Sequence, residues 1–120
     1  MFNKLIASAI TALCLLPVVA TQAMGAPFLA LASWYGPYFH GRTTANGEVY
    51  NQWGLTTAHK SLPFGTRVRV TNPYTKQTII VRVNDRGPYI GPREFDLSRG
   101  AAEAVGLIGP GVAELEFEIL

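Results

Sequence analysis

The sequence predicts a mainly β protein, a compact β-barrel with one short helix. Residues 66–71 and 112–119 alternate polar and apolar side chains with a period of two, as half-buried strands do. Glycine and proline recur between the apolar segments and mark tight turns. Only one short stretch has apolar residues at helical spacing. Several short strands with one small helix favour a barrel, which leaves no exposed strand edges.

The strands expected in chain order cover residues 30–35, 55–58, 66–71, 78–83 and 112–119. Val, Ile and Thr dominate the fourth segment, and such β-branched residues favour extended backbone. A helix is expected next to Ser98, which suits an N-cap, and before Gly106, which suits a C-terminal stop. An apolar stripe lies between them at Ala101, Ala102 and Val105.

The first residues form a separate segment. Lys4 provides a positive start, an apolar run continues to Val19, and small residues follow, which is the order found in secretory signal peptides. We expect a signal peptide over residues 1–26, cleaved between residues 20 and 26, and one domain over residues 27–120. An uncleaved anchor is the alternative, although the run is shorter than the ~20 residues of a membrane span. The domain is therefore expected to be exported, to the periplasm, the cell envelope or the medium.

Cys14 is the only cysteine and lies inside the apolar run, where Leu13 rather than a small residue precedes it. We therefore expect no lipidation and no disulfide in the exported part. The sequence has no cluster of metal-ligand residues, so no metal and no cofactor are expected.

The formal net charge of +2 is far below the basic excess of most nucleic-acid-binding domains, so no nucleic-acid partner is expected. Four arginines alternate along the predicted strands and are interpreted mainly as one solvated sheet face: Arg67, Arg69, Arg82 and Arg86.

The most informative segment is Asn84-Asp85-Arg86-Gly87-Pro88, which follows a rigid apolar strand. A carboxylate delivered into a turn at a strand end is a common layout for an active site. Glu48 and His59 precede it on separate loops, and Asp96 follows it. These residue types, without a cysteine or a metal cluster, indicate acid–base chemistry.

Each of these residues also has a structural interpretation. Glu48 can be a solvated loop carboxylate, and His59 can be a structural histidine. Asp85 can accept backbone N–H groups in a turn. Asp96 can favour the N-terminus of the expected helix through its dipole.

Aromatic residues gather in or near the same predicted loops. Flat rings with polar edges suit sugars, whose C–H faces stack while their hydroxyl groups form hydrogen bonds. The expected substrate-binding residues are Trp34, Tyr35, Tyr38, Tyr50 and Tyr89.

Several linked motifs follow one another between about residues 30 and 120. They are Ala32-Ser33-Trp34-Tyr35-Gly36, His40-Gly41-Arg42-Thr43-Thr44-Ala45-Asn46-Gly47-Glu48, Leu55-Thr56-Thr57-Ala58-His59-Lys60-Ser61-Leu62-Pro63-Phe64-Gly65-Thr66, Val83-Asn84-Asp85-Arg86-Gly87-Pro88, Asp96-Leu97-Ser98 and Gly106-Leu107-Ile108-Gly109. In their residues and order, these motifs resemble the RlpA-like (rare lipoprotein A) family.

The resemblance implies a six-stranded double-psi β-barrel and the activity of a lytic transglycosylase, a lyase that cuts peptidoglycan glycan strands. It places the functional Glu, His and Asp of the family on Glu48, His59 and Asp85. Asp85 is the favoured acid and base, Glu48 is the close alternative, and Asp96 resembles the acid of related double-psi barrel enzymes. A monomer is expected, with cell-division or cell-wall machinery as a partner.

In the implied mechanism, a protonated carboxyl group donates to the glycosidic oxygen. The muramyl 6-hydroxyl then attacks its own anomeric carbon and leaves a 1,6-anhydro end. His59 would orient the acid or relay a proton, and Arg86 or Lys60 would limit the rise of the acid's pKa.

Two other functions remain open at this stage. An expansin-like protein would bind and loosen cell-wall glycan through its aromatic face, without catalysis. A true hydrolase would use two carboxylates and a water molecule.

Overall fold

The computed structural model describes residues 25–120. The expected signal peptide, with Cys14, lies outside these residues except for its last two positions. Six strands follow one another along the chain: β2 (Phe28–Tyr35), β3 (Thr56–His59), β4 (Arg67–Thr71), β5 (Thr78–Asp85), β6 (Phe95–Ser98) and β7 (Ala113–Ile119). A short 3-10 helix, η2 (Pro37–Phe39), follows β2, and the α-helix α3 (Arg99–Ala104) lies between β6 and β7.

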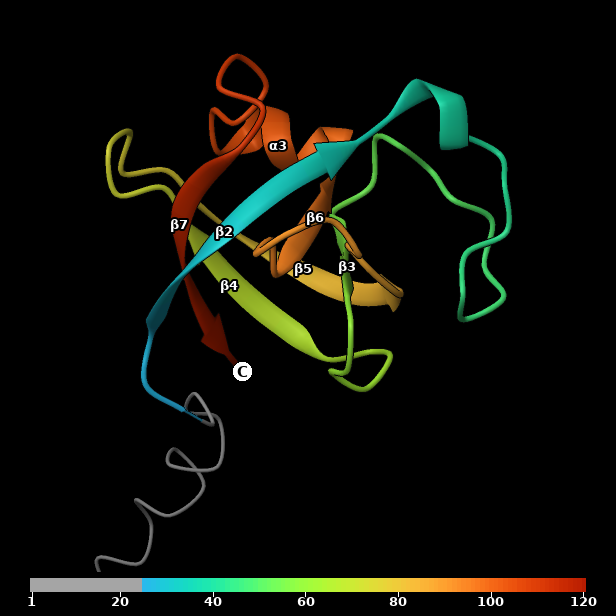
Figure 1. The fold of residues 1–120 in the computed structure, drawn as a ribbon, viewed down its shortest axis with the longest axis horizontal. Coiled ribbons are helices and arrows are strands. Elements are labelled where there is room, and N and C mark those ends of the chain that lie inside the picture. The colour runs from blue at the N-terminus through green and yellow to red at the C-terminus, as the bar shows by residue number, and fades with distance from the viewer. Residues whose placement is uncertain (1–24) are drawn as a thin grey trace, which may run out of the picture.

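The strands form a closed ring. Their order is β2-β6-β3-β5-β4-β7, and β7 pairs with β2 to complete the circle (Figure 1). The pairs β2–β6 and β3–β5 are parallel, and the other four are antiparallel. Strands distant in sequence therefore become neighbours. In particular, β3 lies between β5 and β6, each of which carries an aspartate.

All five strands expected from the sequence patterns are confirmed, with ends displaced by at most two residues. The patterns did not predict β6, which has only four residues. Phe95, Leu97 and Ser98 are all buried, so the strand shows no simple alternation. The helix-dipole interpretation of Asp96 is wrong, because Asp96 lies within β6 and its carboxylate accepts a hydrogen bond from Ser33 on β2.

Apolar side chains from all parts of the ring fill its interior. The rings of Phe95 and Phe117 stack with their centroids 3.8 Å apart and 9° between their planes. Branched residues surround this pair, including Val68, Val70, Val81, Val83, Leu97 and Leu115, all at most 1% exposed. This packing supplies the rigidity that loops at the ends of the strands need if they are to position reactive groups.

The helix begins as the sequence predicts. Ser98 is the N-cap, and its hydroxyl oxygen accepts a hydrogen bond from the N–H of Ala101 at 3.2 Å. Ala101 and Ala102 are buried. Gly106 follows the helix with a φ of +75°, a conformation that favours glycine. In the described part of the chain, neither helix has the length and hydropathy to cross a membrane.

Residues 50–54 dock closely on the first turn of α3. The N–H of Gly100 donates to the carbonyl of Gln52 at 2.7 Å. A Cβ atom at Gly100 would lie 2.4 Å from the carbonyl oxygen of Trp53, which is backbone and cannot rotate away. The absence of a side chain at Gly100 therefore allows this long loop to contact the barrel.

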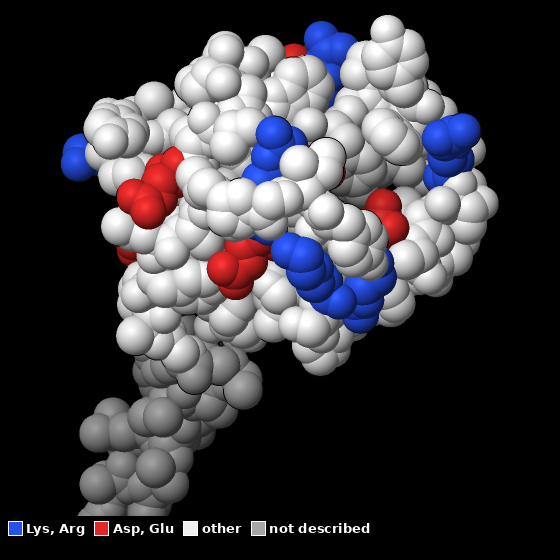
Figure 2. Space-filling view, viewed as in Figure 1, with Lys and Arg blue, Asp and Glu red and all other residues white. Residues whose placement is uncertain are grey.

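Positive and negative side chains are mixed on the surface. On the face drawn in Figure 2, Lys and Arg are interspersed with Asp and Glu, and neither sign forms a continuous block. Such a face differs from the basic stripe with which proteins contact a nucleic-acid backbone.

Replacing Gly100 with alanine tests the docking of the loop. Alanine normally stabilises a helix relative to glycine. Here we expect Gly100→Ala to lower the free energy of unfolding by about 1–3 kcal/mol, because the new methyl group must displace backbone. Gly109→Ala is the control, since a Cβ there meets nothing within 4 Å. Denaturant unfolding measures both, and equal stability of the two variants would contradict the prediction.

Candidate active site

Asp85 and Asp96 lie on either side of Ala58. Ala58 on β3 is the register partner of Asp85 on β5 and of Asp96 on β6. Neighbouring strands are about 4.8 Å apart, so the backbones of the two aspartates are separated by about 10 Å. Only a methyl side chain stands between them.

A register shift decides which residue occupies this place. Thr57 pairs with Val83, and regular pairing would put Ala58 opposite Asn84. The register instead shifts by one residue, so Ala58 pairs with Asp85. Irregularities of this kind re-aim side chains near active sites.

A hollow of about 440 Å³ contains both carboxylates. Ala58 lines it between them, and Arg86 and Arg93 contribute positive charge. Its other walls are apolar and largely aromatic, and they include Trp34, Tyr35, Phe39, Pro88, Tyr89 and Ile90. A concave apolar surface with a few converging polar groups is the usual form of a binding site.

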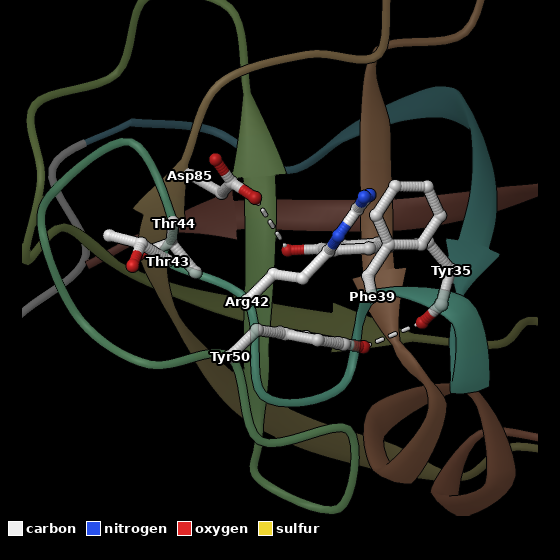
Figure 3. Close-up of a pocket in the computed structure, with 7 residues that line it drawn as sticks. All are labelled: Tyr35, Phe39, Arg42, Thr43, Thr44, Tyr50 and Asp85. Carbon is white, nitrogen blue, oxygen red and sulfur yellow. Dashed lines mark hydrogen bonds between the residues drawn. The ribbon is translucent and has the colours of Figure 1, made fainter.

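A second hollow, of about 230 Å³, shares Tyr35, Phe39 and Asp85 with the first. Its remaining walls come from the loop after η2 and are formed by Arg42, Thr43, Thr44 and Tyr50 (Figure 3). Asp85 therefore borders both hollows.

Three donors hold the carboxylate of Asp85. The hydroxyl of Tyr35 donates to Oδ2 at 3.0 Å, and the N–H groups of Ala45 and Arg86 donate to Oδ1, each at 2.9 Å. Figure 3 shows the carboxylate pointing at the Tyr35 hydroxyl. Donors of this kind suit an ionised carboxylate.

The two tyrosines of the site form a rigid pair. Their rings stack with centroids 4.4 Å apart, and the hydroxyl of Tyr50 donates to the carbonyl of Tyr35 at 2.6 Å. Burial raises the pKa of Tyr50 to about 12. Burial, together with the negative charge of Asp85, also raises the pKa of Tyr35. Tyr35 therefore stays protonated at neutral pH and remains a donor to Asp85.

Asp96 has a different environment. Burial raises the pKa of its carboxyl group, and the nearby charge of Asp85 acts in the same direction. A hydrogen bond from the hydroxyl of Ser33, 2.9 Å from Oδ1, and the positive charge of Arg93 partly oppose this rise. Of the two aspartates, Asp96 has the surroundings that favour a retained proton.

Glu48 is held ionised. Hydrogen bonds from Arg82, Asn84 and Asn46 lower the pKa of its carboxyl group to about 2. The two terminal nitrogens of the Arg82 guanidinium, Nη1 and Nη2, donate to it at 2.5 and 3.0 Å. Glu48 lines neither hollow beside Asp85. The interpretation of Arg82 as a solvated sheet residue is therefore incomplete, since its guanidinium forms a bidentate ion pair.

His59 packs into the protein beside β6. Its Nδ1 accepts hydrogen bonds from the N–H groups of Ser61 and Leu62 at 3.1 and 3.0 Å, so the neutral ring carries its proton on Nε2. Nε2 lies 3.4 Å from Oε2 of Glu94. His59 and Lys60 line a separate hollow of about 300 Å³.

Arg86 connects this turn to Asp85. Its guanidinium donates to the carbonyls of His59 and Leu62 at 3.2 and 2.9 Å. It also lies over the ring of Phe64, 3.8 Å from the ring centroid. The backbone carbonyl of His59 thus contacts Arg86, the neighbour of Asp85, and no direct hydrogen bond joins His59 to Asp85 within residues 25–120.

Comparison with known proteins identifies the family. Residues 29–117 match the model of a family described as "Lytic transglycolase". A Synechocystis protein named "Probable endolytic peptidoglycan transglycosylase RlpA" is 58% identical over 90 residues, which cover 75% of this chain and 28% of that protein. A Campylobacter jejuni protein named "Endolytic peptidoglycan transglycosylase RlpA" is 49% identical over 98 residues, which cover 82% of this chain and 36% of that protein.

The chain belongs to the RlpA-like lytic transglycolase family.

The fold is that of the double-psi β-barrel family, as the resemblance implies. The structure of an expansin from Clavibacter michiganensis matches with a TM-score of 0.63 at 23% identity, over 79% of this chain and 50% of that one. At this identity the match concerns the fold alone. The RlpA-like chain spans about a third of the length of the two curated relatives above.

The residues expected from the sequence separate into three groups. Trp34, Tyr35, Tyr89 and Arg86 line the hollow that contains Asp85 and Asp96, and Tyr50 lines the adjoining one. The second group, Glu48, His59 and Lys60, lies outside both hollows. Tyr38 is 90% exposed and lines neither.

Sequence reasoning missed Arg42 and Arg93, which line the hollows. It counted Phe39 among the aromatic residues near the loops but did not select it as a binding residue. It also missed the contacts of Arg82 and Asn84 with Glu48. A signal for this pair was available, because residues two apart on a strand share a face. Within the described residues, no group of three or more His, Cys, Asp or Glu side chains could hold a metal ion.

The lowered pKa of Glu48 predicts a pH-dependent contribution to stability. A carboxyl group whose folded pKa is depressed stabilises the fold above its ordinary pKa of 4.5, and this contribution is lost as the pH falls toward about 2. The stability difference between the natural chain and Glu48→Gln should therefore be constant above pH 5 and shrink below 4.5. Denaturant unfolding at a series of pH values measures it. A difference that does not change with pH would contradict the prediction.

Proposed function

We propose that this protein is an endolytic peptidoglycan lytic transglycosylase, which cleaves glycan strands between N-acetylmuramic acid and N-acetylglucosamine. The two curated relatives are named as endolytic peptidoglycan transglycosylases, and their matches cover 75% and 82% of this chain. The observation that carries the proposal is the pair of aspartates, Asp85 and Asp96, on either side of Ala58 in one aromatic-walled hollow. Glycoside cleavage requires a proton donor and a proton acceptor at such positions.

Asp96 is the proposed proton donor. Its burial and the neighbouring charge favour the protonated form that an acid needs before the reaction. It would protonate the glycosidic oxygen as the bond between this oxygen and the muramyl anomeric carbon breaks. The sequence favoured Asp85 for this role, with Glu48 as the close alternative and Asp96 as a second candidate. The hydrogen bonds of the two carboxylates support the choice of Asp96 over Asp85 as the acid.

Asp85 is the proposed proton acceptor. Its three donors suit the ionised form. As the muramyl 6-hydroxyl attacks the anomeric carbon, its proton would pass to Asp85 and a 1,6-anhydro ring would close. One C–O bond forms and one breaks, one proton is given and one taken, and no water is consumed. Asp85 then releases its proton to solvent and Asp96 takes one up, which restores both groups for the next turnover.

The aromatic walls would hold the sugars. Tyr89 is 74% exposed at the rim, and Trp34 and Tyr35 line the interior. Stacking against sugar C–H faces places the 6-hydroxyl close to the anomeric carbon, and such positioning accounts for much of the rate enhancement. His59, Lys60 and Arg86 would keep the adjacent turn in place.

Peptidoglycan lies outside the cytoplasmic membrane, so the activity also supports export to the periplasm or cell envelope as a proposal. The monomeric state and an association with cell-division or cell-wall machinery stay predictions.

Product analysis tests the function. Purified sacculi incubated with the protein should release fragments with 1,6-anhydromuramyl ends, detected by mass spectrometry. Reducing muramyl ends would indicate a hydrolase instead. Binding to sacculi without soluble product would indicate an expansin-like protein, which shares this fold.

Substitution of the two aspartates tests the mechanism. We expect Asp85→Asn and Asp96→Asn each to lower turnover by roughly 10²–10⁴-fold, because each removes one proton transfer. The activity of the natural protein should fall as the pH rises through the raised pKa of Asp96, since the donor then loses its proton. Glu94→Gln, outside the hollow of the two aspartates, is the matched control and should retain activity. Full turnover in Asp96→Asn would transfer the role of the acid elsewhere.

A further inference from the structure

The contacts of Glu48 indicate that it attaches one segment of the chain to another, and we call it the anchor. Both carboxylate oxygens are occupied: Arg82 donates to each, Asn84 donates to Oε1 at 3.0 Å and Asn46 donates to Oε2 at 3.0 Å. A carboxylate with four donors and a pKa of about 2 has no proton to give at neutral pH. The question is therefore what this anchor holds.

The anchor joins a loop to a strand. Glu48 and Asn46 belong to the loop of residues 41–50, whereas Arg82 and Asn84 lie two apart on β5 and share a face. The backbone closes the same contact, since the N–H of Asn46 donates to the carbonyl of Asn84 at 3.3 Å. Within the loop, the N–H of Thr44 donates to the carbonyl of Glu48 at 2.7 Å.

The same loop supplies a donor to the catalytic centre. Ala45, between Thr44 and Asn46, donates its N–H to Oδ1 of Asp85 at 2.9 Å. Arg42, Thr43 and Thr44 form the wall of the smaller hollow next to Asp85 (Figure 3). The position of the loop on β5 thus fixes both a hydrogen bond to Asp85 and the shape of one hollow.

The contact between Asn84 and Glu48 leaves the amide oxygen of Asn84 without a hydrogen-bond partner among the described residues. Asn84 is 2% exposed, and this oxygen, Oδ1, is buried. Turning the amide over would bring Oδ1 against the Glu48 carboxylate, so Nδ2 must face Glu48. Buried unpaired oxygens of this kind are rare in proteins and often occur at functional sites.

We propose that Arg82 and Asn84 are positioning residues for the transglycosylase reaction, which act through Glu48 and the 41–50 loop on Asp85. Part of this ion pair is open to solvent, with exposed fractions of 43% for the Arg82 side chain and 36% for Glu48. Exposed ion pairs contribute little to global stability. The loss of Arg82 should therefore remove only part of the stability contributed by the contacts of Glu48, and its larger effect is expected in catalysis.

The test compares Arg82→Ala with Arg69→Ala. Arg69 lies on the neighbouring strand β4 and forms a similar ion pair with Glu118 at 2.5 Å, away from the loop. Both variants lose one positive charge and one ion pair. With soluble glycan strands as substrate, we expect Arg82→Ala to lower kcat by roughly 10²-fold with little change in KM, as a misplaced catalytic group does. Arg69→Ala should retain the natural kcat.

A conservative variant and a double variant test whether Arg82 acts through Glu48. Arg82→Lys should recover part of kcat, because lysine restores the charge but not the bidentate contact. If Arg82 acts only through Glu48, Glu48→Gln combined with Arg82→Ala should be no slower than the slower single variant. Additive losses would overturn the proposal, as would equal kcat values for Arg82→Ala and Arg69→Ala.

A structural readout separates this inference from the proposed function, on which it rests. Hydrogen exchange of the Ala45 amide, followed by NMR, should be faster in Arg82→Ala than in the natural protein and unchanged in Arg69→Ala. If the natural protein releases no anhydromuramyl ends, the proposed activity fails, but this measurement still tests whether Arg82 holds the 41–50 loop on β5. If the natural protein is active but exchange at Ala45 is unchanged in Arg82→Ala, the positioning role of Arg82 is refuted while the proposed activity stands. If Arg82→Ala does not fold, Arg82→Lys is measured in its place.

Discussion

The site depends on the pairing of Ala58 with an aspartate on each side. A strand in the middle of a sheet has two neighbours, and here each of them places a carboxylate opposite the same small residue. The hydrogen-bonded ladder fixes the separation of the backbones at about 10 Å, and Ala58 leaves the space between them open. A larger residue at this position would occupy the hollow. Closure of the ring then prevents the strands from moving apart.

The two aspartates acquire different properties from their surroundings. Asp85 faces three donors, and the phenol that supplies one of them is kept protonated by its own burial. Asp96 accepts a hydrogen bond from one hydroxyl group, and its burial raises its pKa. Desolvation and hydrogen bonding thus give one amino-acid type two different environments, and the proposed donor and acceptor roles rest on this difference. Each aspartate lies on a different strand, so each environment is set separately.

The other polar residues of the family motifs organise loops. Glu48 joins residues 41–50 to β5, His59 caps the turn that follows β3, and Arg86 holds that turn next to Asp85. All three contacts hold loop segments against the barrel beside the hollows. This arrangement explains why these three residues of the family motifs lie far apart in the chain: together they join segments that are distant in sequence. It also explains how groups outside the hollows can affect the chemistry within them.

The sequence alone determined the β class, five of the six strands, the cap at Ser98 and the family, because local periodicity, turn residues and ordered motifs depend on neighbouring residues. It also indicated Asp85 and Asp96 as candidates. The tertiary structure decided that they share one hollow. It also showed that Glu48 joins its own loop to β5 and that His59 contacts the turn after β3. The one-residue register shift at Ala58 and the short strand β6 arise from pairing between segments distant in the chain. No local pattern encodes such pairing, so only the folded ring could show which carboxylates meet.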